Sequence, residues 1–239
     1  MVGRVLRGRI VKRVLRAHRL IPLLALPVLA ACEGPLSTLE PAGPAAREIA
    51  LVWWVMLIGS GVVLALVCGL FLYAFKNRTG LAGVPERVWL IGGGLAFPIV
   101  VLIALLAWAL PSGQSMLPRD DGAFRVEAEA FQWGWRFGYP EGGETLTVLH
   151  IPAGEPVDVA ITTADVIHAF WVPQLAGKID AIPGQTNVLR LFAEEPGLYR
   201  GQCAEFCGIG HAGMDFAVQA HEADDYEAAL ARVLEEAGQ

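Results

Sequence analysis

Basic residues are scarce outside the start of the chain. The first 31 residues hold seven of the 18 Lys and Arg residues and none of the 24 Asp and Glu residues. The rest of the chain keeps 11 basic and 24 acidic residues, a net charge of −13. A field of this sign repels nucleic acid and attracts a basic partner, although acidity on its own also serves solubility. We therefore expect no nucleic-acid partner.

The cysteines are few, and their pattern excludes a covalently attached c-type haem, because no Cys-x2-Cys-His sequence occurs. The chain also lacks internal repeats and low-complexity tracts. Of the four cysteines, Cys32 and Cys68 stand alone, whereas Cys203 and Cys207 are four positions apart. Thiol chemistry is therefore concentrated in one short segment near the C-terminus.

Residues 1–31 have the composition of a secretory signal peptide. Their basic start runs into the apolar stretch LIPLLALPVLAAC, which is shorter than the ~20 apolar residues needed to cross a bilayer. The end of this stretch, Leu29 to Cys32, resembles a bacterial lipobox, in which cleavage precedes the cysteine and the sulfur receives a lipid. An ordinary signal peptide with an incidental cysteine is the alternative. We expect an exported protein with a lipid on Cys32.

Two long apolar runs predict a transmembrane hairpin over residues 49–110. They cover residues 49–75 and 88–110, contain no charged residue, and are each long enough to cross a membrane as a helix. The basic connector between them belongs in the cytoplasm by the positive-inside rule, so the linker 32–48 lies outside. We expect a multi-pass protein of the bacterial plasma (inner) membrane, with its C-terminal domain on the periplasmic face.

The sequence after residue 110 predicts a linker over residues 111–122 and an all-β domain over residues 123–221. Apolar and polar residues alternate with period two in FRVEAEA, TLTVLHI, VDVAITT, NVLRLFA and MDFAVQA. Short strands separated by Gly, Pro and acidic turns are typical of a Greek-key sandwich or barrel. Residues 222–239 carry apolar side chains at helical spacing, which predicts a closing amphipathic helix.

The segment GQCAEFCGIGHAGM, residues 201–214, carries the strongest chemical signal. Outside the cell, two nearby cysteines form a disulfide by default, but a disulfide explains neither His211 nor Met214 beside them. Zinc accepts Cys and His but does not recruit a thioether. Soft thiolates and a thioether combined with imidazole favour copper in an electron-transfer site. Copper is therefore the better interpretation of this segment.

A second imidazole is required, and the chain outside the leader offers three further histidines. We interpret His150 and His221 as surface or capping residues, whereas His168 stands at a strand end among bulky apolar neighbours. One copper ion in an electron-transfer geometry does not use two thiolates, two imidazoles and a thioether. Two copper ions can, if both thiolates bridge them. The donor count therefore favours a dinuclear site.

The segment HAFWVPQLAGKIDAIPGQTN, residues 168–187, together with the ligand segment, resembles the dinuclear CuA site of cytochrome c oxidase subunit II. The resemblance extends to the membrane hairpin and to the aromatic segment FQWGWRFGYP. It implies a membrane-anchored, mainly β chain: two transmembrane helices in a hairpin, followed by a cupredoxin-like Greek-key β-sandwich with a C-terminal helix. The implied ligands are bridging Cys203 and Cys207, terminal His168 and His211, and axial donors from Met214 and the Glu205 carbonyl.

The resemblance also implies roles for further side chains around this site and at the membrane. Electrons enter at Trp133, while Trp135 packs in the core, and Asp165 is a docking residue for the donor. The Glu205 side chain and Asp180 lie near a magnesium or manganese ion shared with subunit I, although Asp180 also suits a turn. Glu86 marks the mouth of a proton pathway, with a helix-start carboxylate as the alternative.

These features predict an electron-input subunit. It accepts electrons from a separate cytochrome c and passes them to haem and copper in subunit I, where dioxygen is reduced to water. A quinol oxidase subunit II lacks the copper ligands that this chain contains. The same motifs are also compatible with a CuA subunit of a nitric oxide reductase and, in a different class, with a non-enzymatic copper or zinc lipoprotein.

Overall fold

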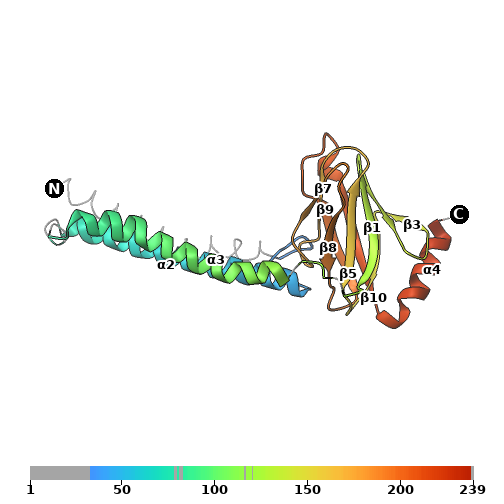
Figure 1. Cartoon of the computed structure of the whole chain (residues 1–239), viewed down its shortest axis with the longest axis horizontal. Helices are drawn as coiled ribbons and strands as arrows, with labels where there is room; N and C mark the ends of the chain where they lie inside the picture. Colours follow the sequence, from blue (N-terminus) through green and yellow to red (C-terminus); the bar gives the residue numbers. More distant parts are fainter. Residues whose placement is uncertain (1–32, 78–79, 81–82, 116, 120, 238–239) are drawn as a thin grey trace, which may run out of the picture.

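The computed structural model describes residues 33–77, 80, 83–115, 117–119 and 121–237. Two long helices extend from one side of a β-sandwich, and a short helix packs at its far side (Figure 1). The predicted signal peptide and Cys32 lie outside the described residues. The mainly β architecture with two preceding helices agrees with the fold predicted from the sequence.

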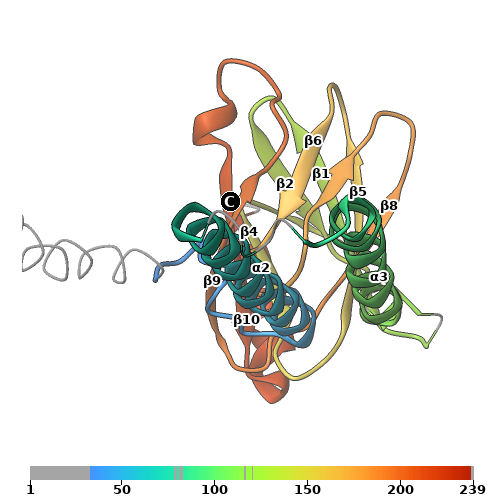
Figure 2. The ribbon, with the colours of Figure 1, turned by 90° about the vertical axis from the view of Figure 1, so that its left-hand side faces the viewer.

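The two long helices are apolar over most of their length. Helix α2 spans Pro44–Lys76, and the second rod consists of a π-helical segment, Val88–Ala96, that continues into α3, Phe97–Ser115. Both contain a stretch long and apolar enough to cross a membrane, and that stretch is not buried within the chain. Helix α2 begins before the apolar run at residue 49, because Pro44 suits a first helical turn. Figure 2 looks along the hairpin toward the sandwich.

In the described residues, ten strands form two five-stranded sheets that face each other. One sheet has the order β3-β2-β1-β5-β8 and the other the order β4-β10-β9-β6-β7. Most neighbouring strands are antiparallel, but β1 pairs with β5 and β10 pairs with β4 in parallel. The strands are β1 Phe124–Phe131, β2 Gly134–Gly138, β3 Glu144–Leu146, β4 Val148–Pro152, β5 Val157–Thr163, β6 His168–Trp171, β7 Ile179–Ala181, β8 Asn187–Leu191, β9 Gly197–Cys203 and β10 Asp215–His221.

One predicted strand divides between the two layers. The segment TLTVLHI forms β3 in one sheet and β4 in the other, and Thr147 between them has a φ of 67°. This left-handed conformation turns the backbone out of the first sheet. Leu146 and Val148 keep the period-two spacing across Thr147, so the sequence pattern alone does not place a break at this residue.

The core between the sheets is rich in aromatic side chains. Trp135, Phe137, Phe170 and Phe216 are fully buried, and the rings of Phe170 and Phe216 lie 4.6 Å apart. Trp135 contacts both of these rings at 5.3 to 5.4 Å. Its predicted packing role is therefore confirmed. This aromatic cluster lies beneath the end of the sandwich that carries His168, because the Trp135 ring also contacts the His168 ring.

The sandwich is tied to both helices by a cluster of polar contacts. The Arg190 guanidinium donates to Asp158 on β5 and to Asp121 in the linker after α3. On the other side, the backbone N–H of Ala42 donates to Gln174, and that of Glu194 donates to Ala42. These contacts hold the sandwich against the ends of the helices.

The C-terminal helix α4, Tyr226–Ala237, confirms the predicted amphipathic segment. It begins after a 3-10 turn at Ala223–Asp225, and its apolar face contains buried Tyr226, Ala229 and Leu230. The ring of Tyr226 packs edge-on against Phe124 of β1. The helix therefore closes the far side of the sandwich.

Candidate metal centre

The predicted ligands gather at one edge of the second sheet. His168 begins β6, Cys203 ends β9, and Met214 immediately precedes β10. Because β9 is antiparallel to both β6 and β10, these three strand ends meet at the same edge. The loop between β9 and β10 carries Cys207 and His211 over this edge.

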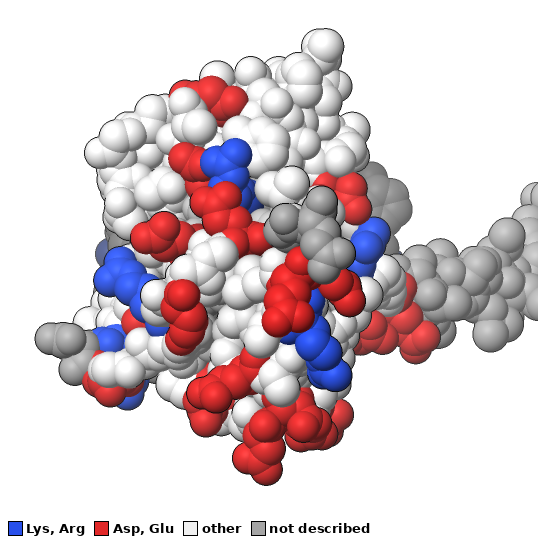
Figure 3. All heavy atoms as spheres, turned by 90° about the vertical axis from the view of Figure 1, so that its right-hand side faces the viewer, with Lys and Arg blue, Asp and Glu red and all other residues white. Residues whose placement is uncertain are grey.

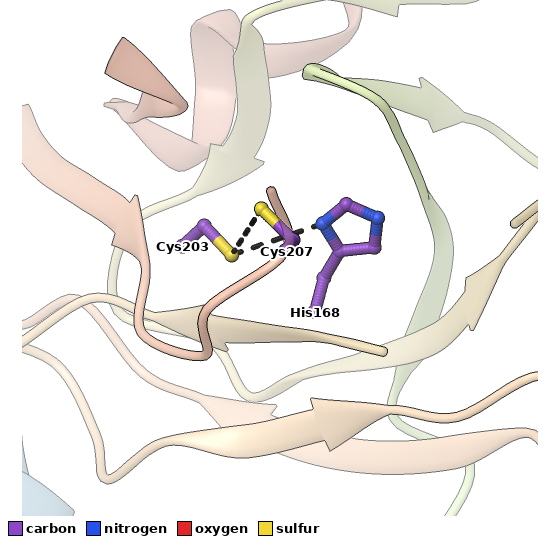
Figure 4. Close-up of side chains that lie close together, drawn as sticks. All are labelled: His168, Cys203 and Cys207. Atoms are coloured by element: carbon purple, nitrogen blue, oxygen red, sulfur yellow. Dashed lines mark hydrogen bonds between the residues drawn. The ribbon is translucent and has the colours of Figure 1, made fainter. Parts of the chain in front are cut away.

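The donor atoms of these residues lie close together. The two sulfurs of Cys203 and Cys207 are 3.8 Å apart, and the His168 Nδ1 is 3.8 Å from the Cys203 sulfur (Figure 4). His211 Nδ1 and Met214 Sδ are each 3.7 Å from the Cys207 sulfur. The Glu205 carbonyl oxygen is 3.3 Å from the Cys203 sulfur. The structure therefore brings together all six predicted donors.

The two thiols are free, and their separation suits a shared metal better than a disulfide. A disulfide requires sulfurs about 2.05 Å apart, whereas these are 3.8 Å apart. A metal–thiolate bond is about 2.3 Å long, so two sulfurs at this separation can bind the same ion. Cys203, Cys207, Met214 and His168 are all almost completely buried. This dry, sulfur-rich donor set fits copper.

Burial makes the Cys207 thiol a weak acid before any metal binds. Loss of solvent and then the neighbouring Cys203 raise the pKa of Cys207 to about 11. The thiol therefore keeps its proton at neutral pH. A metal that binds here has to displace that proton, which couples metal binding to pH.

Asp165 lies behind His168 on the side away from the sulfurs. Its Oδ1 is 2.8 Å from His168 Nε2, and its two oxygens also accept the backbone N–H groups of Gln132 and Val166. Partial burial raises the pKa of this carboxyl, but the hydrogen bonds from His168, Val166 and Gln132 outweigh it and bring the pKa below its usual value. Asp165 is exposed, as its predicted docking role requires, but it also contacts His168, a predicted metal ligand.

Trp133 joins the molecular surface to the ligand loop. Its ring is 40% exposed, and its Nε1 donates to the Cys207 carbonyl at 3.2 Å. The Gln132 side-chain amide donates to the same carbonyl at 2.8 Å. A Cβ atom at Gly210 would lie 2.4 Å from the Trp133 ring, so only glycine permits this contact. The role of Gln132 was not predicted from the sequence, because no local pattern marks it.

The structure places Asp180 and the Glu205 side chain around the same hollow, of about 670 Å³. The Lys178 ammonium lies between them, 3.8 Å from an Asp180 oxygen and 3.7 Å from a Glu205 oxygen. All three side chains are half exposed. Lys178 was not predicted from the sequence, and it supplies the positive charge beside these carboxylates within this chain. The two carboxylates alone do not form a closed magnesium or manganese site.

The prediction for His150 and His221 is wrong. Neither is a capping residue, and His150 is not on the surface: it is 7% exposed, and its Nδ1 lies 2.8 Å from Nε2 of the partly exposed His221. The two rings are stacked, with centroids 5.1 Å apart. Parallel pairing of β4 with β10 brings these distant positions together. Glu86 lies exposed at the first turn of the second membrane helix, outside the sandwich.

The chain is similar to proteins of a known family. The sequence model of the family "Cytochrome C oxidase subunit II, periplasmic domain" matches residues 144–221. The chain is 34% identical over 232 residues to cytochrome c oxidase subunit 2 of Alkalihalophilus pseudofirmus, covering 89% of this chain and 67% of that protein. The chain belongs to the cytochrome c oxidase subunit II family.

Quinol oxidase subunits are also among its relatives. Quinol oxidase subunit 2 of Bacillus cereus is 30% identical over 233 residues, covering 91% of this chain and 80% of that protein. A solved structure, the periplasmic domain of cytochrome oxidase subunit II from Bradyrhizobium japonicum, is 31% identical and covers 51% of this chain and 98% of its own, with a TM-score of 0.46. The chain therefore belongs to an oxidoreductase family whose members include both cytochrome c oxidase and quinol oxidase subunits.

Proposed function

We propose that this chain is the electron-input subunit of a cytochrome c oxidase. It accepts electrons from a separate cytochrome c at a dinuclear copper centre and passes them to haem and copper in subunit I, for reduction of dioxygen to water. The observation that carries the proposal is the convergence of two buried thiols, two imidazoles and a thioether within 3.8 Å of a cysteine sulfur.

Each protein group has a defined task in this proposal. Cys203 and Cys207 would hold the two ions as shared thiolates, His168 and His211 would supply one imidazole to each ion, and Met214 and the Glu205 carbonyl would be weaker donors. The bound copper pair supplies one-electron redox chemistry. The second sheet fixes the strand ends that carry His168, Cys203 and Met214, and the burial of these side chains keeps water from the donors.

The donor set favours cytochrome c over quinol as the electron source. A quinol oxidase subunit II needs no copper ligands, whereas here six donors converge on one site whose two sulfurs are buried. Acidic side chains are spread over the face that points away from the helices, with few basic ones among them (Figure 3). Such a surface attracts a basic protein in a salt-dependent way. Trp133 provides an exposed ring in hydrogen-bond contact with the ligand loop.

The proposal also covers the surroundings of the site. The exposed apolar flanks of α2 and α3 suit burial in the bacterial plasma membrane beside subunit I and other oxidase subunits, with the sandwich on the periplasmic face. Glu86 is assigned to a proton pathway, and Cys32 to a lipid anchor. Asp180 and Glu205 are assigned to a magnesium or manganese site that subunit I completes.

Copper loading of the full-length protein in detergent tests the central claim. We expect two copper ions per chain and an electron paramagnetic resonance signal delocalised over both. Cys203→Ser and Cys207→Ser should abolish that signal, whereas Cys68→Ser, on the exposed surface of α2, should keep it. Reduced cytochrome c should reduce the centre, and a quinol should not. Binding of a single zinc ion, a mononuclear copper signal, or reduction by quinol alone would contradict the proposal.

A further inference from the structure

The two imidazoles at the candidate metal centre have different surroundings. His168 is fully buried, and its Nε2 lies 2.8 Å from Asp165 Oδ1. His211 is partly exposed, and its ring packs edge-on against Phe206. Among the residues that the structure describes, no carboxylate lies within hydrogen-bond distance of His211. The imidazole of His168 is therefore held by a carboxylate, and that of His211 is not.

The hydrogen bond to Asp165 determines which His168 nitrogen faces the metal. In Figure 4 one ring nitrogen, Nδ1, points toward Cys203, and the other lies on the far side of the ring. A carboxylate accepts but does not donate when ionised, so the proton resides on Nε2. Nδ1 is then the free lone pair that a metal requires. A carboxylate behind a ligating imidazole also raises the basicity of that imidazole.

Asp165 is itself held in place by several donors. Its Oδ2 accepts the Gln132 N–H at 2.7 Å, and its Oδ1 accepts the Val166 N–H at 2.6 Å besides His168. Both carboxylate oxygens face donors, so neither position accepts an amide nitrogen. An asparagine here would leave one donor facing its NH2 group. The site therefore selects a carboxylate and not merely a polar side chain.

We propose that Asp165 is a positioning residue that fixes the tautomer and orientation of His168, and that it makes the two halves of the metal centre electronically unequal. The inference rests on the proposed copper function, and it adds a role to the docking role predicted for Asp165. Because a negative charge beside a ligand favours the more positive oxidised state, Asp165 lowers the reduction potential of the centre.

Asp165→Asn and Asp165→Ala, made in the full-length protein, test the proposal against Glu129→Gln. Glu129 lies on the neighbouring strand β1, pairs with Arg136 and is not a predicted ligand, so its substitution removes one negative charge without touching the centre. We expect both Asp165 variants to raise the reduction potential, to change the nitrogen hyperfine couplings, and to weaken copper retention by about 10- to 100-fold. Glu129→Gln should leave all three at the values of the unsubstituted protein.

A second measurement needs no copper. Nitrogen-15 resonances of the metal-free chain should show His168 as the Nε2–H tautomer, and Asp165→Ala should abolish that preference. If the Asp165 variants change only the KM for the donor, with unchanged potential, spectra and tautomer, Asp165 is a docking residue alone and the positioning role is wrong. Failure of the unsubstituted protein to bind two copper ions would instead contradict the proposed function, while the tautomer measurement would still decide the role of Asp165.

Discussion

The two ends of the sandwich each carry a pair of histidines, and the pairs behave differently. Strand β10 links them, since it starts directly after Met214 at the candidate metal centre and ends at His221. At the first end, His168 and His211 each place a nitrogen 3.7 to 3.8 Å from a cysteine sulfur. At the second end, the His150 Nδ1 and the His221 Nε2 lie 2.8 Å apart. In the proposed function, the same type of side chain serves ligation at one end, whereas it packs against its own kind at the other.

The difference lies in the neighbours. At the ligand end a glycine-containing loop folds over the strand edge and brings soft donors above buried aromatic rings. At the other end, Tyr139 accepts the backbone N–H of His150, and Tyr226 of α4 lies beside His221. Burial and then the stacked His221 lower the pKa of His150 to about 4. The His150 imidazole is therefore neutral at neutral pH.

The largest effect should come from removing one sulfur at the ligand end. Cys207→Ser is expected to abolish the dinuclear copper signal completely, because a hydroxyl does not bridge two copper ions at neutral pH. The unfolding midpoint of the metal-free chain should hardly change, since serine is only slightly smaller. His150→Gln is the matched variant at the other end and should retain the full copper signal. Loss of the signal in both variants would show that the two ends are not independent.

The stability of the metal-free protein should depend on pH through the histidine pair at the second end. His150 has a pKa near 4 in the folded chain, against about 6.5 when exposed, so the unfolded chain binds the extra proton between these values. The contribution of His150 to the free energy of unfolding is present in full above pH 6.5. As the pH falls toward 4, this free energy decreases by about 3 kcal/mol. Thermal unfolding of the metal-free protein at several pH values measures this loss. His150→Gln should flatten the dependence over this range, whereas His211→Gln, outside the stacked pair, should not; equal slopes in all three proteins would refute the assignment.

The ligand end was more accessible to sequence analysis than the opposite end. Cys203, Cys207, His211 and Met214 lie within one segment, so their residue types and spacing already indicate a soft-metal site. His150 and His221 are 71 residues apart and meet only because β4 pairs with β10 in parallel. Hydrophobic periodicity gives no information on strand pairing, and the pair was therefore missed.

The strands show the same limit. The long alternating segments at β1, β5, β8 and β10 were predicted, whereas β6 and β7, with four and three residues, are too short for period-two alternation to stand out. For Asp165, the sequence indicated an acidic residue near a ligand. Only the fold shows that its carboxylate reaches His168 and the Gln132 backbone.

Packing beneath the ligand end can be tested with a smaller change. A Cβ atom at Gly201 would lie 2.5 Å from two carbons of the buried Phe216 ring, so Gly201→Ala forces the core to shift. We expect the free energy of unfolding to fall by about 1–3 kcal/mol. Gly213→Ala, where a Cβ atom meets nothing within 4 Å, is the matched control in the ligand loop. Chemical denaturation of both variants measures the difference, and a stable Gly201→Ala protein would show that the core adjusts freely.

The smallest effect on stability should come from the tip of the ligand loop. Ile209 is 95% exposed and lies beside Gly208 and Gly210, which contact Trp133. An exposed side chain adds little to the fold, so Ile209→Ser should change the free energy of unfolding by less than about 0.5 kcal/mol. If the donor covers this tip when it docks, loss of the apolar contact should raise the KM for cytochrome c by about threefold, with kcat unchanged. Leu198→Ser, exposed on β9 away from the loop, controls for general surface effects. An unchanged KM would mean that the donor docks elsewhere. The loop tip beside Trp133 would then no longer support electron entry at Trp133.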